Sequence, residues 1–276
     1  MAVGNGILVL LSYQIDEKGE KMKVFCFSIL FIFSLFGTCN ADSSLPRTVA
    51  KIKPAIVAIG TYQHTRSPAA IFRGTGFVVG DGTLVVTNAH VLPKKMNFKA
   101  KERLGLFVKE ASKVRFISVK KLAVDEEHDV ALLRLSGKPL PPLKMGDSGK
   151  VREGELYAFT GFPIGMVLGI YPVTHRGIVS AISPIAIPVH NSKQLSPRMV
   201  RRLKKPYKVF QLDATAYPGN SGSPLYDTKT GVVVGVINKV FVKETKESVI
   251  QKPSGISYAI PIKYAQRLVA KIKGKK

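Results

Sequence analysis

The chain has 276 residues, 45% of them hydrophobic, and a formal net charge of +24. This length and apolar content are sufficient for one large hydrophobic core or two small ones. The positive charge favours anionic partners, but the sequence has no RNA-binding signature and no interleaved aromatic pattern, so dedicated nucleic-acid recognition is not expected.

Residues 1–41 are predicted to be a targeting segment. Lys21 and Lys23 precede an uncharged run of 14 residues, 24–37, which a small-residue stretch ending at Ala41 follows. The run is shorter than the roughly 20 residues of a membrane span and is typical of a signal-peptide core. We therefore expect cleavage after Ala41 and export to the periplasm or the cell exterior.

The residues before this core fit it poorly. Asp16, Glu17 and Glu20 place acidic charge where a signal peptide is basic, so we predict that translation starts at Met22. Both cysteines, Cys26 and Cys39, would leave with the signal, and the mature chain would then contain no thiol or disulfide. A lipoprotein anchor at Cys39 is the alternative, but the residues before it match the required small-residue box poorly.

The remaining sequence favours an all-β fold. Runs rich in Val and Ile, such as 77–79, 84–86 and 130–135, recur between Gly and Pro residues, and long helical periodicity is scarce. Helical patterns occur only near 45–53 and 261–273. In the latter, Ile262, Ala265, Val269 and Ile272 fall on one face.

Three polar side chains stand at the ends of predicted buried strands. His90 ends one apolar run, Asp129 opens another 39 residues later, and Ser221 follows after 92 more, in the glycine turn Gly219-Asn-Ser-Gly222. A serine hydroxyl becomes an effective nucleophile only with a base and a stabilised oxyanion. The chain order His, Asp, Ser is that of the chymotrypsin-type arrangement.

Six short motifs between about residues 50 and 262 resemble those of the trypsin-like serine proteases, most closely the HtrA/Deg branch. They are Gly74-Thr-Gly-Phe-Val-Val79, Thr87-Asn-Ala-His-Val91, His128-Asp-Val-Ala-Leu-Leu133, Gly177-Ile-Val-Ser-Ala181, Pro218-Gly-Asn-Ser-Gly-Ser-Pro-Leu225 and Gly255-Ile-Ser-Tyr-Ala-Ile-Pro261. The resemblance implies two six-stranded antiparallel β-barrels, at about 50–145 and 150–262, followed by a helix at about 262–273. The trypsin-like protease domain would occupy 42–276, without the PDZ domain that HtrA-type proteins usually carry.

The resemblance also implies residue roles. His90 would act as general base and then acid, Asp129 would orient it, and Ser221 would be the nucleophile. The backbone N–H groups of Gly219 and Ser221 would form the oxyanion hole. Asn220 stands where trypsin-like zymogens place the Asp that pairs with a freed N-terminus, so activation of that kind is not expected.

The specificity pocket is predicted to be apolar. Thr215 occupies the position of the acid that selects Arg or Lys in trypsin, and Ile237 would line a wall, which favours small or medium aliphatic side chains. Alternatively, Ile237 only packs in the second barrel. Gly222-Ser223 resembles the glutamyl endopeptidase and exfoliative toxin group, but the His of that group falls on Ile237, so glutamyl specificity is not expected.

The excess positive charge is clustered. Residues 94–121 hold ten Lys or Arg against Glu102 and Glu110, and residues 193–208 hold seven and no acid. Residues 196–205 within the second cluster are predicted to form a short capped helix. Anionic surfaces or acidic proteins are the expected partners, and an ordinary solvated surface is the alternative.

Taken together, these features predict an exported serine endopeptidase that acts on unfolded or exported proteins, with no cofactor and no metal site. A secreted peptidase with a narrow target, related to the glutamyl endopeptidases, is one alternative. A cationic binding protein with a vestigial protease site is another. The sequence leaves open whether the chain is a monomer or a trimer.

Overall fold

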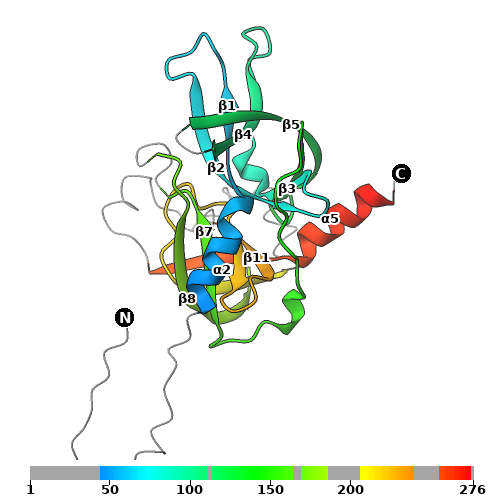
Figure 1. Ribbon diagram of the computed structural model, residues 1–276. Coiled ribbons are helices and arrows are strands. Elements are labelled where there is room, and N and C mark those ends of the chain that lie inside the picture. The colour runs from blue at the N-terminus through cyan, green and yellow to red at the C-terminus, as the bar shows by residue number, and fades with distance from the viewer. Residues whose placement is uncertain (1–43, 111–112, 164–168, 186–205, 239–254, 275–276) are drawn as a thin grey trace, which may run out of the picture. The chain divides into compact units, whose positions relative to one another are not determined.

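The computed structural model describes residues 44–110, 113–163, 169–185, 206–238 and 255–274. Within these residues the chain forms two closed antiparallel barrels of six strands each, which confirms the predicted all-β class (Figure 1). The predicted signal segment, 1–41, and the predicted basic helix, 196–205, lie outside the described residues.

Barrel one has the strand order β1-β2-β3-β6-β5-β4. Its strands are β1 (Ile56–Tyr62), β2 (Ala70–Val79), β3 (Leu84–Thr87), β4 (Arg103–Glu110), β5 (Lys113–Asp125) and β6 (Val130–Leu135).

Barrel two has the order β10-β11-β12-β9-β8-β7. Its strands are β7 (Leu156–Gly161), β8 (Val173–Pro184), β9 (Lys208–Asp213), β10 (Pro224–Asp227), β11 (Val233–Asn238) and β12 (Ile256–Pro261).

The main hydrophobic core joins the two barrels. Phe77, Val85 and Leu132 of barrel one belong to the same buried cluster as Tyr226 and Val236 of barrel two. The strands near this junction, such as β3 and β11, are buried along their whole length, so their sequences are continuous apolar runs rather than alternating ones. A smaller core lies within barrel two alone. The shared core keeps the facing ends of the two barrels in fixed positions.

Two α-helices among the described residues flank the barrels, and each packs on the barrel that is distant from it in sequence. Helix α2 (Ser44–Ile52) precedes barrel one but contacts barrel two, where the Thr48 hydroxyl donates a 3.1 Å hydrogen bond to the Lys229 carbonyl. Helix α5 (Lys263–Lys273) follows barrel two but packs on β5 and β6 (Figure 1). No helix in the described ranges is long and apolar enough to cross a membrane.

The buried face of α5 is wider than the pattern predicted. Ala265 and Val269 are buried as expected, and Tyr264 and Leu268 extend the face. The Tyr264 ring stacks on the His128 imidazole, with 3.8 Å between ring centroids. The helix thereby covers the turn that leads into β6.

Candidate active site

His90 and Asp129 both lie at strand ends of barrel one. β3 ends at Thr87, and a short 3-10 turn, Ala89–Val91, carries His90. Asp129 lies in the turn before β6 and adopts a left-handed backbone conformation, with φ of 56°. Asp tolerates this conformation better than most side chains because its short polar side chain forms local hydrogen bonds.

The carboxylate of Asp129 is buried and accepts three hydrogen bonds. Its Oδ2 lies 2.6 Å from His90 Nδ1 and accepts a 2.7 Å bond from Asn238 Nδ2, and its Oδ1 accepts a 2.9 Å bond from the His90 amide. A carboxylate with only acceptor capacity requires a proton on the facing Nδ1. The other ring nitrogen of a neutral His90, Nε2, is then free to accept a proton.

The backbone of Asp129 is fixed as well. Its carbonyl accepts a 3.2 Å bond from the Ala89 amide and a 3.0 Å bond from Asn88 Nδ2. The loop that carries His90 and the turn that carries Asp129 are thus joined by one main-chain bond and one bond from a side chain, both to the Asp129 carbonyl. This second set of bonds limits the relative movement of the two side chains.

Ser221 lies in a turn shaped by two glycines. Gly219 and Gly222 have φ values of +102° and +91°, which side chains other than glycine rarely adopt. The Asn220 carbonyl accepts a 3.0 Å bond from the Ser223 amide, which closes the turn before β10. Among the hydrogen bonds between described residues, none uses the N–H of Gly219 or Ser221. These two donors are therefore available to a substrate oxygen.

Thr75 of β2 holds the Ser221 turn from the other barrel. Its amide donates a 2.9 Å bond to the Ser221 carbonyl, and its hydroxyl donates a 2.7 Å bond to the Gly219 carbonyl. The same hydroxyl accepts a 3.1 Å bond from the Phe162 amide. A Cβ atom added to Gly222 would lie 1.9 Å from the Thr75 carbonyl oxygen, so only glycine allows this approach.

Gly74 of β2 lies against both Val91, which follows His90, and the Ser221 backbone. A Cβ atom built on Gly74 would lie 2.7 Å from Val91 Cγ2 and 3.0 Å from the Ser221 carbonyl oxygen. Within the part of the chain that the structure describes, no hydrogen bond joins Ser221 to the His90 ring. The structure therefore brings His90 and Asp129 into direct contact and places Ser221, 6% exposed, against the same strand.

The two residues predicted for the specificity pocket differ in exposure. Thr215 is half-buried in the segment before the Ser221 turn. Ile237 is fully buried and belongs to the core of barrel two, together with Phe159 and Leu225. Its backbone carbonyl accepts a 2.9 Å bond from the Gly222 amide. Ile237 thus packs in the barrel, which corresponds to the alternative interpretation, and it supports the turn through its backbone.

Asn220 is fully buried, and neither polar atom of its side chain has a hydrogen-bond partner among the described residues. A carboxylate at this position would require an opposite charge nearby, because an unpaired buried charge is costly. The neutral amide is consistent with the expectation that an N-terminal ion pair is not used here.

Sequence reasoning missed two residues near the site. Asn238 received no role, although a polar residue that ends the apolar run 232–237 is the same kind of signal that identified His90. His175 of β8 stacks on Phe159, with 5.0 Å between centroids, and lies 6.0 Å from the Tyr217 ring. Burial lowers the pKa of His175, which lies beside the segment that leads to Ser221.

The sequence of this chain is similar to those of known serine proteases. Residues 74–236 match the family model described as a trypsin-like peptidase domain. Serine protease HTRA1A of Danio rerio is 31% identical over 221 residues, 77% of this chain and 38% of that protein. A "Probable periplasmic serine endoprotease DegP-like" of Pseudomonas putida is 32% identical over 194 residues, 70% of this chain and 33% of that protein.

Among solved structures, the HtrA-type protease AlgW with a tripeptide superimposes with a TM-score of 0.59 at 24% identity. The superposition covers 83% of this chain and 63% of that one, and it supports the fold. The chain spans 33–38% of the length of the two curated relatives above.

Proposed function

Because the chain belongs to the trypsin-like peptidase family, we propose that it is a serine endopeptidase with Ser221 as nucleophile. His90 is the general base and acid, and Asp129 orients it. The observation that carries this proposal is the buried Asp129 carboxylate at 2.6 Å from His90 Nδ1, in a molecule whose β2 strand also bonds to the Ser221 turn. The catalytic groups come from both barrels.

In the proposed reaction His90 Nε2 removes the Ser221 proton as the hydroxyl oxygen attacks the scissile carbonyl. The buried Asp129 carboxylate stabilises the imidazolium that forms. The N–H groups of Gly219 and Ser221 donate to the oxyanion. His90 then protonates the leaving amine, and a water molecule, deprotonated by His90, hydrolyses the acyl-enzyme.

The proposed substrates are unfolded or exported proteins, cleaved after small or medium aliphatic residues. Thr215 offers no charge for binding Arg or Lys, and a pocket without a charged group discriminates only weakly between aliphatic side chains. The DegP-like relatives are described as periplasmic, which supports an exported protein. We therefore propose that the activity is periplasmic or extracellular.

Labelling with a serine-directed fluorophosphonate tests the nucleophile. We expect one label on Ser221, no label on Ser221→Ala, and loss of casein hydrolysis in Ser221→Ala, His90→Ala and Asp129→Asn. Ser223→Ala is the matched control, because this serine lies two positions away on the same turn and is fully buried. Retained labelling or turnover in Ser221→Ala contradicts the assignment.

A further inference from the structure

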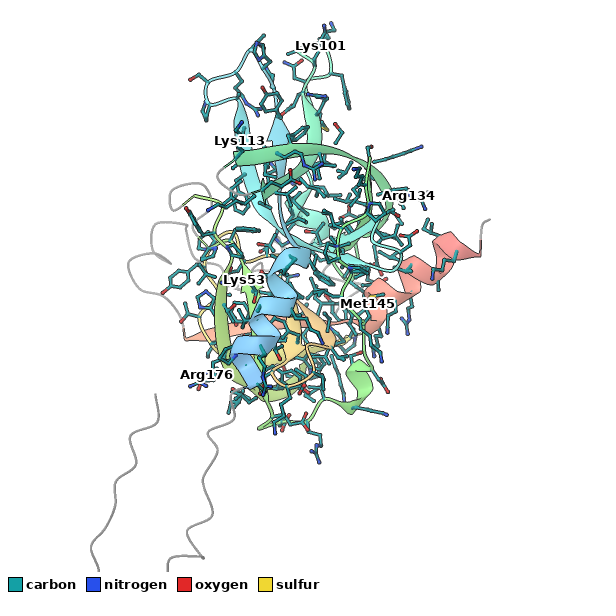
Figure 2. All side chains as sticks on the ribbon, viewed as in Figure 1. Lys53, Lys101, Lys113, Arg134, Met145 and Arg176 are labelled. Carbon is teal, nitrogen blue, oxygen red and sulfur yellow. The ribbon has the colours of Figure 1, made fainter. Side chains whose placement is uncertain are left out.

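The segment 94–103 follows the candidate base His90 and carries charge that the proposed reaction does not use. Lys94, Lys95, Lys99, Lys101 and Arg103 are all exposed, and Glu102 is the only acid among these residues. Figure 2 shows Lys101 at the far tip of barrel one. This tip loop, defined as residues 94–103, is therefore strongly cationic toward solvent.

Glu102 does not offset this charge at the surface, because it is turned inward. Its side chain is 11% exposed and forms a 2.7 Å ion pair with Arg66 of the β1–β2 loop. Its second carboxylate oxygen accepts a 2.8 Å bond from the Asn97 amide. Arg66 also donates to carbonyls at Thr61, Pro68 and Ala69, so both partners are fixed. The charge that the tip loop presents to solvent therefore comes from its lysines and Arg103.

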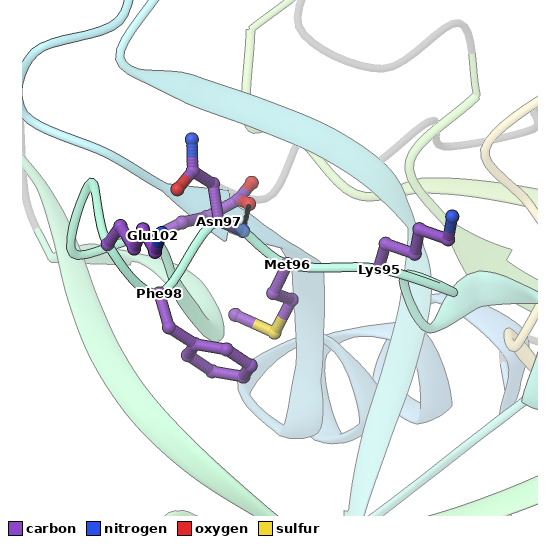
Figure 3. A pocket seen from close by; sticks show the side chains of 6 residues that line it. Lys95, Met96, Asn97, Phe98 and Glu102 are labelled. Carbon is purple, nitrogen blue, oxygen red and sulfur yellow. Dashed lines mark hydrogen bonds between the residues drawn. The ribbon is translucent and has the colours of Figure 1, made fainter.

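The tip loop also exposes a large apolar side chain. Phe98 is 76% exposed, more than any other large hydrophobic residue in the described ranges. Tyr171 is the next most exposed at 61%, but its ring already has a partner, because the ammonium group of Lys109 lies 3.5 Å from the ring centroid. Phe98 and Met96 line a surface hollow, and Figure 3 shows their side chains on one side of the loop, with Asn97 on the other.

Phe98 is held in this exposed position by an ordered turn. The Phe98 carbonyl accepts a 3.0 Å bond from the Lys101 amide, and the Asn97 carbonyl accepts a 3.0 Å bond from the Glu102 amide. The Asn97 side chain accepts a further 3.1 Å bond from the Ala100 amide. Because the turn is already ordered, binding through Phe98 would cost little conformational entropy.

We propose that the tip loop is a membrane-docking element that inserts Phe98 and Met96 into the interface of an anionic phospholipid bilayer. Lysine ammonium groups pair with headgroup phosphates while the apolar side chains reach the acyl boundary directly below them. An acidic peptide or single-stranded nucleic acid would satisfy the lysines but offers no hydrocarbon layer for Met96. The bilayer supplies both kinds of contact within one surface.

The chain contains no tryptophan, so Phe98→Trp introduces a single indole at the tip. We expect its emission to shift to shorter wavelength with vesicles of mixed phosphatidylcholine and phosphatidylglycerol and to be quenched by brominated acyl chains. Vesicles of phosphatidylcholine alone should have little effect. Leu156→Trp, at a 43% exposed position on β7, is the matched control and should not respond.

Co-sedimentation with the same vesicles measures how much Phe98 and Lys99 each contribute to binding. Phe98→Ser should lower the partition coefficient by at least about tenfold, because a phenylalanine side chain no longer leaves water. Lys99→Gln should lower it by about fivefold. Leu156→Ser and Lys271→Gln, at exposed positions of β7 and α5, should leave it unchanged, and thermal unfolding verifies that each variant is folded.

Several outcomes would overturn the proposal. One is equal vesicle binding by wild type and Phe98→Ser, which would leave only diffuse electrostatic attraction. Another is a response of Phe98→Trp to single-stranded DNA without a blue shift on anionic vesicles, which would identify a nucleic-acid contact. No binding of the wild-type chain to anionic vesicles would also exclude the docking role. None of these results depends on peptidase activity, so the proposed function is tested separately.

Discussion

Asn238, the last residue of β11 in barrel two, donates a 2.7 Å hydrogen bond to the same carboxylate oxygen of Asp129 that faces His90. The bond connects the barrel that carries Ser221 with the barrel that carries His90. Without this bond, the buried Asp129 carboxylate would accept one hydrogen bond fewer. Asn238 therefore positions Asp129, although it does not itself meet the substrate in the proposed reaction.

Asn238→Ala should lower kcat by about tenfold with little change in KM, because Asp129 keeps its bond to His90 but loses a second restraint. Tyr226→Phe is the control, since it removes a buried 2.7 Å bond to Thr160 within barrel two and no bond to Asp129 or His90. Steady-state kinetics on a peptide substrate compares the two. An unchanged kcat in folded Asn238→Ala would show that the bond has no positioning role.

Gly222→Ala should abolish hydrolysis and destabilise the protein. The new Cβ atom would meet the Thr75 carbonyl at 1.9 Å, and the φ of +91° strains any side chain. Gly137→Ala separates these effects, because Gly137 has a φ of +111° but nothing within 4 Å of an added Cβ. We expect that control to lose only about 1 kcal/mol in urea unfolding and to keep full activity. Equal behaviour of the two variants would contradict the close-approach argument.

Glu102 should make stability depend on pH. The hydrogen bond from the Asn97 amide, followed by those of Thr61 and Arg66, lowers the pKa of Glu102 from its ordinary 4.5 to about 2. A lowered pKa in the folded state gives stability that is complete above the unfolded pKa and is lost as pH falls toward 2. Glu102→Gln should thus be less stable than wild type by about 1 kcal/mol at pH 7, given the polar surroundings.

The pH profile of unfolding tests this point. The gap between wild type and Glu102→Gln should narrow steadily as pH falls from about 4.5 toward 2. Glu110→Gln is a suitable comparison, because Glu110 also pairs with an arginine, Arg115, but its side chain is 57% exposed. A gap that persists unchanged at low pH would rule out the charge of Glu102 as its cause.

Helix α5 should support the turn that carries Asp129. Tyr264 is 4% exposed and stacks on His128, whose Nδ1 lies 2.7 Å from Asp125 Oδ2. Tyr264→Ala should cost about 3 kcal/mol in urea unfolding and lower kcat, since the support under His128 is removed. Lys271→Ala, on the exposed face of the same helix, should change neither value. A stable Tyr264→Ala variant would show that α5 contributes little to this turn.

The sequence predicted the architecture well where patterns are local. His90, Asp129 and Ser221 each follow or precede an apolar run, and the structure has a strand at each of those runs. The 45–53 and 261–273 helical patterns correspond to α2 and α5. These features depend on propensity and periodicity, which a single sequence contains.

Contacts between distant segments could not be read in the same way. Thr75 lies in the recognised motif 74–79, but the motif assigned it no role, because its bonds to the Ser221 turn depend on how β2 meets barrel two. Phe98 is of a residue type that is usually buried in a core. Only the Arg66–Glu102 ion pair and the hydrogen bonds of the turn explain why its side chain stays exposed. Such features arise from tertiary geometry, because sequence spacing does not determine which loops meet.

The crossed packing of the two terminal helices has a consequence for synthesis. Thr48 on α2 bonds to Lys229, 181 residues later, and α5, which covers barrel one, is the last described element to leave the ribosome. Chains usually fold domain by domain as they emerge, but here barrel one lacks the helix that covers it until α5 has been translated. Barrel one therefore cannot finish burying its apolar surface until α5 has been synthesised, and α2 has no partner for Thr48 until Lys229 has been added.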